Sequence, residues 1–240
     1  IADEGVTVVN ASERERAYLQ VRTAKEGNAV VAMKVNGEIY WSWHIWCTDY
    51  EPNVTEGQKF FNNLVWMDRN LGAMTNEYTI DGGVKGLFYQ WGRKDPFPAS
   101  EGWTDQEKML YTLTGTTNLS YKEVDTSENL VEAIRQPARF LIAITSPGDW
   151  YTNSMSLLNR TLWLPNTKTI FDPCPVGWRV PGNQPWTGLL QGGLFYSYGL
   201  VHPDAGYFPC TGYRRPQTGR VDSLGNIVEW SAVAGSTSTN

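Results

Sequence analysis

The clearest pattern of hydrophobic and polar positions lies between residues 28 and 47. Residues 28–35 are rich in β-forming side chains, and Asn36 with Gly37 is the pair that best forms a two-residue type I′ turn. Residues 38–47 then alternate with a period of two, which predicts the return strand of a hairpin. One face of that strand carries Trp41, Trp43, Ile45 and Cys47, and the other carries Tyr40, Ser42, His44 and Trp46. The first face is the more apolar, so we expect it to face the core.

Two stretches have the spacing of short helices. Thr104 and Glu107 form a capping box, apolar residues follow at helical spacing, and Gly115 ends the pattern. A second box begins at Asp125, and its helix is expected to end before Pro137. Residues 140–145 after it read as a short buried strand.

Residues 171–181 (FDPCPVGWRVP) combine three prolines with core-type side chains. Proline excludes both a long helix and a central strand here, so a rigid, extended segment that enters the interior is expected. We predict that Trp178 in this segment and Trp66 further upstream are buried and contact the same core.

The composition limits the classes of function. The 240 residues could form one large domain or two small ones, and a net charge of −5 offers no basic patch for nucleic acid. The eleven tryptophans and twelve tyrosines are many. Most are expected in the core, and the rest as sugar-stacking or interface rings. The chain has no run of 18 apolar residues, which predicts no membrane span. It begins at Ile1 without a signal peptide, as expected of a processed form or a fragment.

Candidate chemistry is sparse. The sequence lacks the hydrolase, zinc-protease, Walker and dinucleotide-binding motifs, so no catalytic residue and no metal ligand is assigned. His44 is interpreted as a hydrogen-bonded structural histidine, because no second histidine or acid cluster accompanies it. Three cysteines form no disulfide framework. Either Cys47 and Cys210 form a bridge, or Cys47, Cys174 and Cys210 are three separate buried thiols packed as small hydrophobic groups. We favour the separate buried thiols.

Four separated motifs carry a resemblance to a known family. They are residues 66–72 (WMDRNLG), 86–97 (GLFYQWGRKDPF), 172–181 (DPCPVGWRVP), and 212–214 (GYR) with 230–231 (WS), and a lead-in at 41–46 (WSWHIW) and 48–50 (TDY) precedes them. In this order they resemble the Fibrobacter succinogenes major paralogous domain family, found in surface and fimbrial-tip proteins of Bacteroides-type bacteria. The resemblance covers roughly residues 28 to 231.

The resemblance implies an α+β protein with a C-type-lectin-like fold. We expect an N-terminal β hairpin region and connector over residues 1–56. Residues 57–240 would form the C-type-lectin-like domain, with short antiparallel sheets, two short helices and long loops. Family members usually continue past Trp-Ser with an aromatic strand and a closing Val-Arg-Cys strand, which would supply a partner for Cys174. The chain is expected to lack these closing strands.

The resemblance further implies an exported binding or adhesion protein, attached to the outer membrane as a lipoprotein or associated with a pilus. Its partners would be a glycan or surface-protein ligand, and other fimbrial subunits. The alternatives are a structural pilus subunit whose edge strand a neighbour completes, and a carbohydrate-active enzyme. The spatial distance between two carboxylates, which a glycosidase would need, is not visible in the sequence. C-type-lectin-like folds also host the formylglycine-generating enzymes.

Loop aromatics beside an amide are the best candidates for ligand contact. These are Trp150 and Tyr151 next to Asn153, and Trp103 before the first expected helix. We predict that at least one of the three rings is more than a third exposed; the alternative is that they pin loops to the core. Residues 51–53 (Glu-Pro-Asn) match the tripeptide that binds calcium and sugar in calcium-dependent lectins. They lie before the family domain, so a connector turn is favoured over calcium, and no cofactor is expected.

Overall fold

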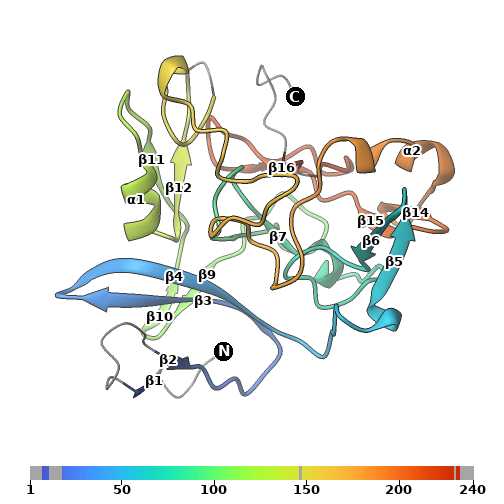
Figure 1. The fold of residues 1–240 in the computed structure, drawn as a ribbon, viewed down its shortest axis with the longest axis horizontal. Helices are drawn as coiled ribbons and strands as arrows, with labels where there is room; N and C mark the ends of the chain where they lie inside the picture. The colour runs from blue at the N-terminus through green and yellow to red at the C-terminus, as the bar shows by residue number, and fades with distance from the viewer. Residues whose placement is uncertain (1–6, 11–17, 146–147, 230, 233–240) are drawn as a thin grey trace.

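The structure is a computed structural model that describes residues 7–10, 18–145, 148–229 and 231–232 (Figure 1). Short two-stranded sheets, one three-stranded sheet and two short helices are joined by long loops. This arrangement of small, mainly antiparallel sheets with few helices is compatible with an α+β or a mostly β protein.

The strands of the first half are β1 (Thr7–Asn10), β2 (Tyr18–Gln20), β3 (Gly27–Val35), β4 (Glu38–Cys47), β5 (Gln58–Phe61), β6 (Leu64–Met67), β7 (Leu87–Phe88) and β8 (Phe97–Pro98). The later elements are β9 (Leu110–Thr112), β10 (Gly115–Thr117), β11 (Ser120–Glu123), α1 (Leu130–Arg135), β12 (Arg139–Ile142), α2 (Leu189–Gly192), β13 (Leu194–Tyr196), β14 (Gly199–His202), β15 (Gly206–Pro209), β16 (Tyr213–Arg214) and β17 (Val221–Asp222). Single 3₁₀ turns cover Thr55–Gly57, Gly83–Lys85, Met155–Leu157 and Gln184–Trp186.

The predicted hairpin is confirmed. Strands β3 and β4 pair antiparallel, and Asn36 and Gly37 take the left-handed φ values of +52° and +86° that a type I′ turn requires. The second predicted helix is confirmed as α1, which begins later than its capping box, at Leu130. It connects β11 to β12, the one parallel pair among the described strands, and packs against β4 (Figure 1).

The first predicted helix is wrong, because residues 110–117 form the β9–β10 hairpin. This stretch contains several threonines, whose branched side chains disfavour helix and favour strand. The Thr112 hydroxyl also donates to the Gly115 carbonyl across the turn at 3.0 Å. Glu107 does not cap a helix: its carboxylate pairs with Arg214 at 2.8 Å and accepts the Val221 N–H at 3.0 Å.

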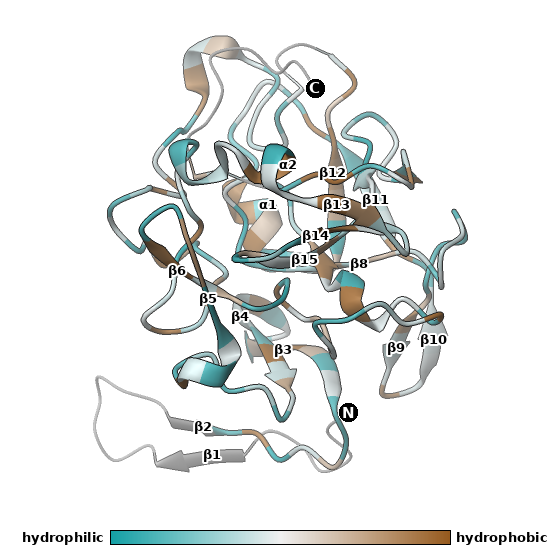
Figure 2. Ribbon diagram, turned by 90° about the vertical axis from the view of Figure 1, so that its right-hand side faces the viewer, coloured by the Kyte–Doolittle hydropathy of each residue, from teal (hydrophilic) through white to brown (hydrophobic). Residues whose placement is uncertain are grey.

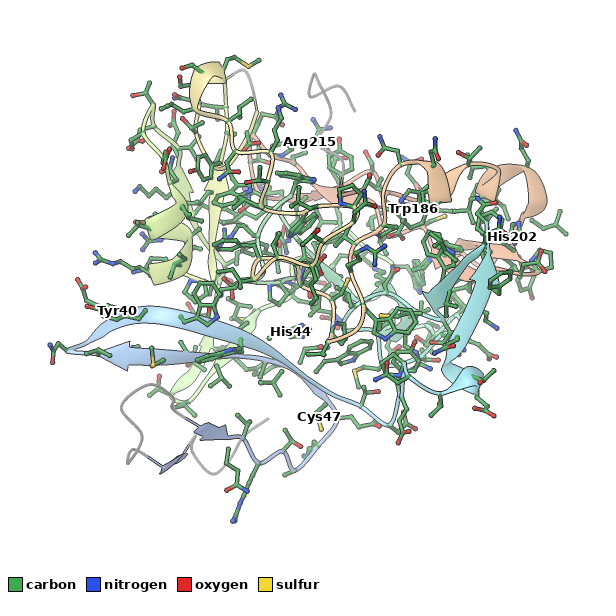
Figure 3. All side chains as sticks on the ribbon, viewed as in Figure 1. Tyr40, His44, Cys47, Trp186, His202 and Arg215 are labelled. Atoms are coloured by element: carbon green, nitrogen blue, oxygen red, sulfur yellow. The ribbon has the colours of Figure 1, made fainter. Side chains whose placement is uncertain are left out.

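The prediction for the buried face of β4 is also wrong. Ser42 is fully buried and donates to Asp95 Oδ1 at 2.7 Å, whereas the Trp43 ring on the opposite face is 37% exposed. His44 lies midway along β4, between Tyr40 and Cys47 at its two ends (Figure 3). Polar side chains can occupy the inner face here because each finds a buried partner.

Residues 86–97 include β7 and the first residue of β8, and we refer to this interior segment as the 86–97 loop. The Gln90 side chain makes both backbone hydrogen bonds of Leu141 on β12, donating to its carbonyl at 2.8 Å and accepting its N–H at 3.2 Å. Arg93 is buried and donates to four groups, of which the Arg139 carbonyl at 2.8 Å is one. Polar side chains thus provide hydrogen bonds that longer strands would otherwise supply.

The core of the described residues is divided into four clusters, and residues of this loop belong to or pack against three of them. Parts of strands β6 and β12 are coloured as hydrophobic in Figure 2. The clusters are Val124, Ala133, Leu141, Ala143, Trp150, Tyr151 and Leu162; Tyr89, Trp163, Val180 and Ala232; Leu189, Leu200, Ala205 and Phe208; and Phe97, Leu119 and Phe140. The described helices include none long and apolar enough to cross a bilayer.

The prediction that Trp66 and Trp178 share a core is wrong. Both rings are only half-buried. Trp66 packs edge-on against Trp186 at 4.8 Å, whereas Trp178 donates from Nε1 to Asn53 Oδ1 at 3.0 Å in the connector. In the 171–181 segment, Val180 supplies the buried contact instead.

The three cysteines are free, so the Cys47–Cys210 bridge is absent and the thiols are separate, as favoured. The expectation that all three are buried is wrong for Cys47 and Cys174. Cys210 is buried, and Cys47 and Cys174 are half-buried. Cys47 donates to the Thr23 hydroxyl at 3.0 Å.

Candidate ligand-binding surface

Two of the predicted ligand-binding aromatics are buried, and their assignment is therefore wrong. Trp150 and Tyr151 are each 4% exposed and belong to the largest core cluster. The Trp150 indole donates to the Trp91 carbonyl, and the backbone N–H of Asn153 donates to the Asp125 carbonyl at 3.0 Å. This stretch pins its loop to the core, as the alternative reading held.

Trp103, the third predicted ring, is half-buried and lies in a stack of three aromatic rings. Its centroid is 5.4 Å from that of Tyr78 and 5.0 Å from that of Tyr198, with interplanar angles of 24° and 23°. The two tyrosine rings are 5.9 Å apart and nearly parallel, at 14°. We refer to Tyr78, Trp103 and Tyr198 as the aromatic cluster.

The distances exclude a sandwich with Trp103 in the middle. Rings on opposite faces of the indole would be separated by two van der Waals layers, about 7 Å. The observed 5.9 Å between Tyr78 and Tyr198 is shorter than that. The indole therefore does not lie between the two phenol rings, and the exposed fractions are 37% for Tyr78 and 59% for Tyr198.

Lys85 supports the cluster from the interior. Its ammonium lies 4.8 Å from the Trp103 ring centroid, within cation–π range, and donates to the Ser100 hydroxyl at 2.7 Å and to the Gly102 carbonyl. The residue is buried, and this burial lowers the pKa of Lys85 to about 8. Because the Trp103 Nε1–H also donates to the Thr79 carbonyl at 2.8 Å, the indole is fixed in its plane.

The backbone of Tyr198 is held in an uncommon conformation. Ser197 and Tyr198 form the two-residue turn between β13 and β14, with φ values of +47° and +56°. Two other described hairpin turns have left-handed φ at both positions. They place Asn36–Gly37 and Asn62–Asn63 there, which are residue types that tolerate left-handed φ. A bulky residue there is strained.

Hydrogen bonds hold this turn in place. The Tyr207 hydroxyl donates to the Ser197 carbonyl at 2.5 Å, and the Cys210 N–H donates to the Tyr198 carbonyl at 2.7 Å. The Tyr207 ring packs directly against Gly199. A Cβ at that position would come within 2.3 Å of the ring, so only glycine fits. Burial raises the pKa of Tyr207 to about 12, and nearby Tyr78 adds to the shift.

Sequence reasoning identified Trp103 and missed Tyr78 and Tyr198. The three residues come from loops far apart in the chain, and no local spacing connects them. The one local signal was the position of Ser197 and Tyr198 between two β segments, where a turn rich in asparagine or glycine would be usual.

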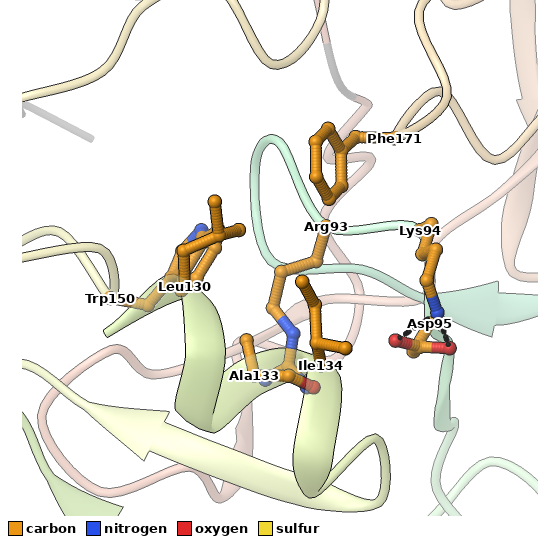
Figure 4. A pocket seen from close by; sticks show the side chains of 8 residues that line it. All are labelled: Arg93, Lys94, Asp95, Leu130, Ala133, Ile134, Trp150 and Phe171. Atoms are coloured by element: carbon orange, nitrogen blue, oxygen red, sulfur yellow. Dashed lines mark hydrogen bonds and ion pairs between the residues drawn. The ribbon is translucent and has the colours of Figure 1, made fainter. Parts of the chain in front are cut away.

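The described part of the chain has no deep cleft at this surface. The two best-formed recesses of the described residues each have room for about one water molecule. One lies between α1 and the 86–97 loop, where Arg93 and the Lys94–Asp95 ion pair face Trp150 and Phe171 (Figure 4). The other lies between β3, β4 and residues 21–25. Neither recess could hold an organic ligand.

Residues 51–53, considered for calcium, form a connector turn. The Glu51 carbonyl accepts the Val54 N–H at 3.3 Å, and the Asn53 side-chain oxygen is occupied by the Trp178 indole. Within the described ranges, no three His, Cys, Asp or Glu side chains gather as a metal site would need.

The hydrogen bonds of His44 support its structural reading. Asn28 Nδ2 donates to the Gly72 carbonyl at 2.7 Å, so Asn28 Oδ1 is free to accept from His44 Nε2 at 2.9 Å. The Tyr89 hydroxyl then donates to Nδ1 at 3.2 Å. Burial lowers the pKa of His44 to about 4, which keeps the ring neutral.

Comparisons of the chain with protein-family models, with curated proteins and with solved structures gave no match in any of the three.

Proposed function

We propose that this chain is an exported cell-surface binding or adhesion protein with a C-type-lectin-like fold, and that the aromatic cluster contacts its ligand, a glycan or a surface protein. The family motifs of the sequence support the class. The observation that carries the site is the pair of exposed tyrosines, Tyr78 and Tyr198, whose rings pack with each other and with the ring of Trp103.

The cluster has the properties of a preformed contact surface. Aromatic rings bury a large area at a low cost in conformational entropy, and these three are already ordered by stacking. Neither phenol hydroxyl of Tyr78 and Tyr198 has a hydrogen-bond partner among the described residues, so both remain available to a ligand. A strained Tyr198 is consistent with a ring retained for contact rather than for stability.

The test measures binding to glycan arrays and to host-type and bacterial cell surfaces. Tyr198→Gly removes the ring and suits the left-handed turn, so it is expected to abolish binding without unfolding the protein. Tyr111→Ala is the matched control, because Tyr111 is 79% exposed on β9 and lies outside the cluster. Equal loss in both variants, or unchanged binding in Tyr198→Gly, would contradict the proposed site.

A structural pilus subunit is the second candidate, and β13 favours it. This strand lies at the edge of the β13–β14–β15 sheet, and its residues Leu194, Phe195 and Tyr196 are 77%, 67% and 72% exposed. Exposed apolar edge strands are usually blocked by charge or covered by a partner. A strand of another fimbrial subunit paired with β13 would cover this one. Phe195→Lys would then prevent assembly and leave the glycan-array signal unchanged.

A further inference from the structure

We infer that two copies of this chain pair through the free edge of β13, antiparallel and about a twofold axis at Phe195. The inference goes beyond the proposed function, because it assigns a partner to a strand that is not part of the aromatic cluster. It also names an occupant of β13 other than the fimbrial strand considered above. It is carried by the hydrogen-bonding pattern of the edge, by its side chains and by its lack of charge.

The backbone of Phe195 directs its polar groups away from the sheet. Among the described strands β13 pairs only with β14 (Figure 2). Tyr196 and Gly199 flank the two-residue turn and exchange hydrogen bonds, so the next pair, Phe195 and Leu200, is a non-hydrogen-bonded one. The N–H and C=O of Phe195 therefore face the open edge, and neither has a partner among the described residues. A second copy of Phe195 can bond to both.

The side chains of β13 match their own copies in this register. Phe195 lies opposite Phe195 of the second copy, and Leu194 lies opposite Tyr196 of the second copy. All three side chains are exposed in the single chain. Aromatic–aromatic and aromatic–aliphatic pairs across two strands each stabilise a sheet, so the pairing gains from both faces.

The core stops one strand short of this edge. Phe195 pairs with Leu200 and Leu200 with Phe208, so the three side chains share one face of the sheet. Leu200 and Phe208 are buried in one of the four core clusters, whereas Phe195 is exposed. The Phe195 ring of a second copy would extend this core across the axis.

The edge carries no charge that opposes self-pairing. Residues 180–203, which include α2, β13 and β14, contain no Asp, Glu, Lys or Arg. Asp204 follows β14, and Lys59 packs against β15. Glu77 precedes Tyr78, whose ring contacts the β13–β14 turn. Because each copy has a net charge of −5, the copies repel at long range, and added salt should strengthen the pair.

The exposed area sets the strength of the pairing. Five exposed apolar side chains come from α2, β13 and β14: Leu190, Leu194, Phe195, Tyr196 and Val201. Together they expose roughly 600 Å² in each copy, so the pair would bury at most about 1,200 Å² in total. Stable interfaces begin near this size, and we therefore expect a reversible dimer with a Kd on the order of micromolar.

The experiment is sedimentation velocity of the purified whole chain between about 1 μM and about 200 μM, at about 0.05 M and about 0.5 M salt. We expect monomer at the low concentration, dimer at the high concentration and no larger species, with tighter association at the higher salt. Hydrogen exchange of residues 193–197, measured by mass spectrometry, should be slower at the high concentration, because the Phe195 N–H is then bonded.

Charged variants test the twofold axis. Phe195→Lys and Phe195→Asp should each remain monomeric, because like charges would lie opposite each other. An equimolar mixture of the two at the lower salt should associate at least about tenfold more tightly than either variant alone, since opposite charges then meet across the axis. Tyr111→Lys on β9 is the matched control and should dimerise as the wild type does. Circular dichroism of each variant confirms that it is folded.

A wild-type chain that stays monomeric at about 200 μM would overturn the inference, whether β13 then binds vesicles of neutral lipid or a strand of another subunit. A dimer that persists in Phe195→Lys would overturn it too, as would a mixture that associates no better than its components. The proposed function is tested separately, because Tyr198→Gly leaves β13 unchanged.

Discussion

The ring of Tyr198 stacks on Trp103 at 5.0 Å while its own backbone holds a left-handed φ of +56°. A favourable aromatic contact and an unfavourable backbone conformation thus occur in the same residue. The two contributions can be separated by substitutions that remove the ring and differ only in how well they tolerate the turn.

We expect Tyr198→Gly to have a free energy of unfolding about 1 kcal/mol higher than that of Tyr198→Ala, measured by urea titration. Both variants lose the ring, but only alanine keeps the strain. Tyr196 in β13 is the control, since in a strand the glycine variant should be the less stable of the two by about 0.5–1 kcal/mol. Equal stabilities of the two Tyr198 variants would show that the turn is not strained.

Lys85 is expected to make stability depend on pH in the alkaline range. Its pKa is lowered to about 8 by burial, below the ordinary value of 10.5, so the folded state binds fewer protons than the unfolded state between these values. The destabilising contribution of Lys85 is complete below pH 8 and is relieved as the pH rises towards 10. The free energy of unfolding of Lys85→Met, relative to that of the wild type, should therefore be higher at pH 7 than at pH 10. Lys34→Met, an exposed lysine on β3, is the control.

Glu229 is expected to make the protein less stable as the pH rises towards neutral, which is opposite to the effect of Lys85. Burial raises the pKa of this carboxyl to about 7, against an ordinary 4.5, although the Asn70 side chain donates to it at 3.4 Å. The folded state holds the extra proton between these values, so stability is lost as the pH rises from 4.5 to 7. Glu229→Gln should be more stable than the wild type at pH 7.5 and equal to it at pH 4.5. An exposed carboxylate on β11, changed as Glu123→Gln, should give no such difference.

The buried ion pair of Lys94 and Asp95 gives a double-mutant test. Lys94 Nζ lies 2.7 Å from Asp95 Oδ1 and 2.5 Å from the Ser42 hydroxyl. Lys94→Met leaves a buried carboxylate without its cation, at a cost of about 3–5 kcal/mol. Adding Asp95→Asn removes that charge, so the double variant should be more stable than Lys94→Met alone. Additive losses in chemical unfolding would rule out coupling.

The three cysteines should titrate as three free thiols in the denatured, unreduced protein. In the folded protein Cys174 and Cys210 should both react slowly, because burial raises the pKa of both thiols. A single reactive thiol after denaturation would mean that a disulfide forms after all. Matched titration of Cys210→Ser identifies which signal belongs to that residue.

The sequence predicted elements whose signals are local. Asn36 with Gly37 specified the β3–β4 hairpin, and apolar spacing before Pro137 specified α1. The helix expected after Thr104 failed because a capping box competed with a run of threonines, and the strand preference prevailed.

Features that depend on distant partners could not be predicted. The inner face of β4 carries Ser42 and His44, which are buried only because Asp95 and Tyr89 satisfy them. For the same reason Trp103 was identified alone, without Tyr78 and Tyr198. Conversely, the loop with Trp150 and Tyr151 has the sequence pattern of an exposed contact site. It is buried because the Trp150 indole donates a hydrogen bond to the carbonyl of Trp91, which is distant in the sequence.

The interior loop of residues 86–97 also bears on how the chain reaches its native state. Three of its side chains form hydrogen bonds with residues far away in the sequence. Asp95 accepts from Ser42, Gln90 donates to the Leu141 carbonyl, and the Trp91 indole donates to the Ser231 carbonyl at 3.0 Å. Each of these hydrogen bonds can form only after a long segment of chain has lost conformational entropy by closing into a loop. Contacts between residues that are far apart in the sequence therefore slow folding. A hairpin such as β3–β4 can form early, because its turn brings the two strands together. The 86–97 loop makes all of its hydrogen bonds only after Ser231, near the end of the described residues, has packed against it. The small sheets are therefore expected to become stable together, late, and in one cooperative step.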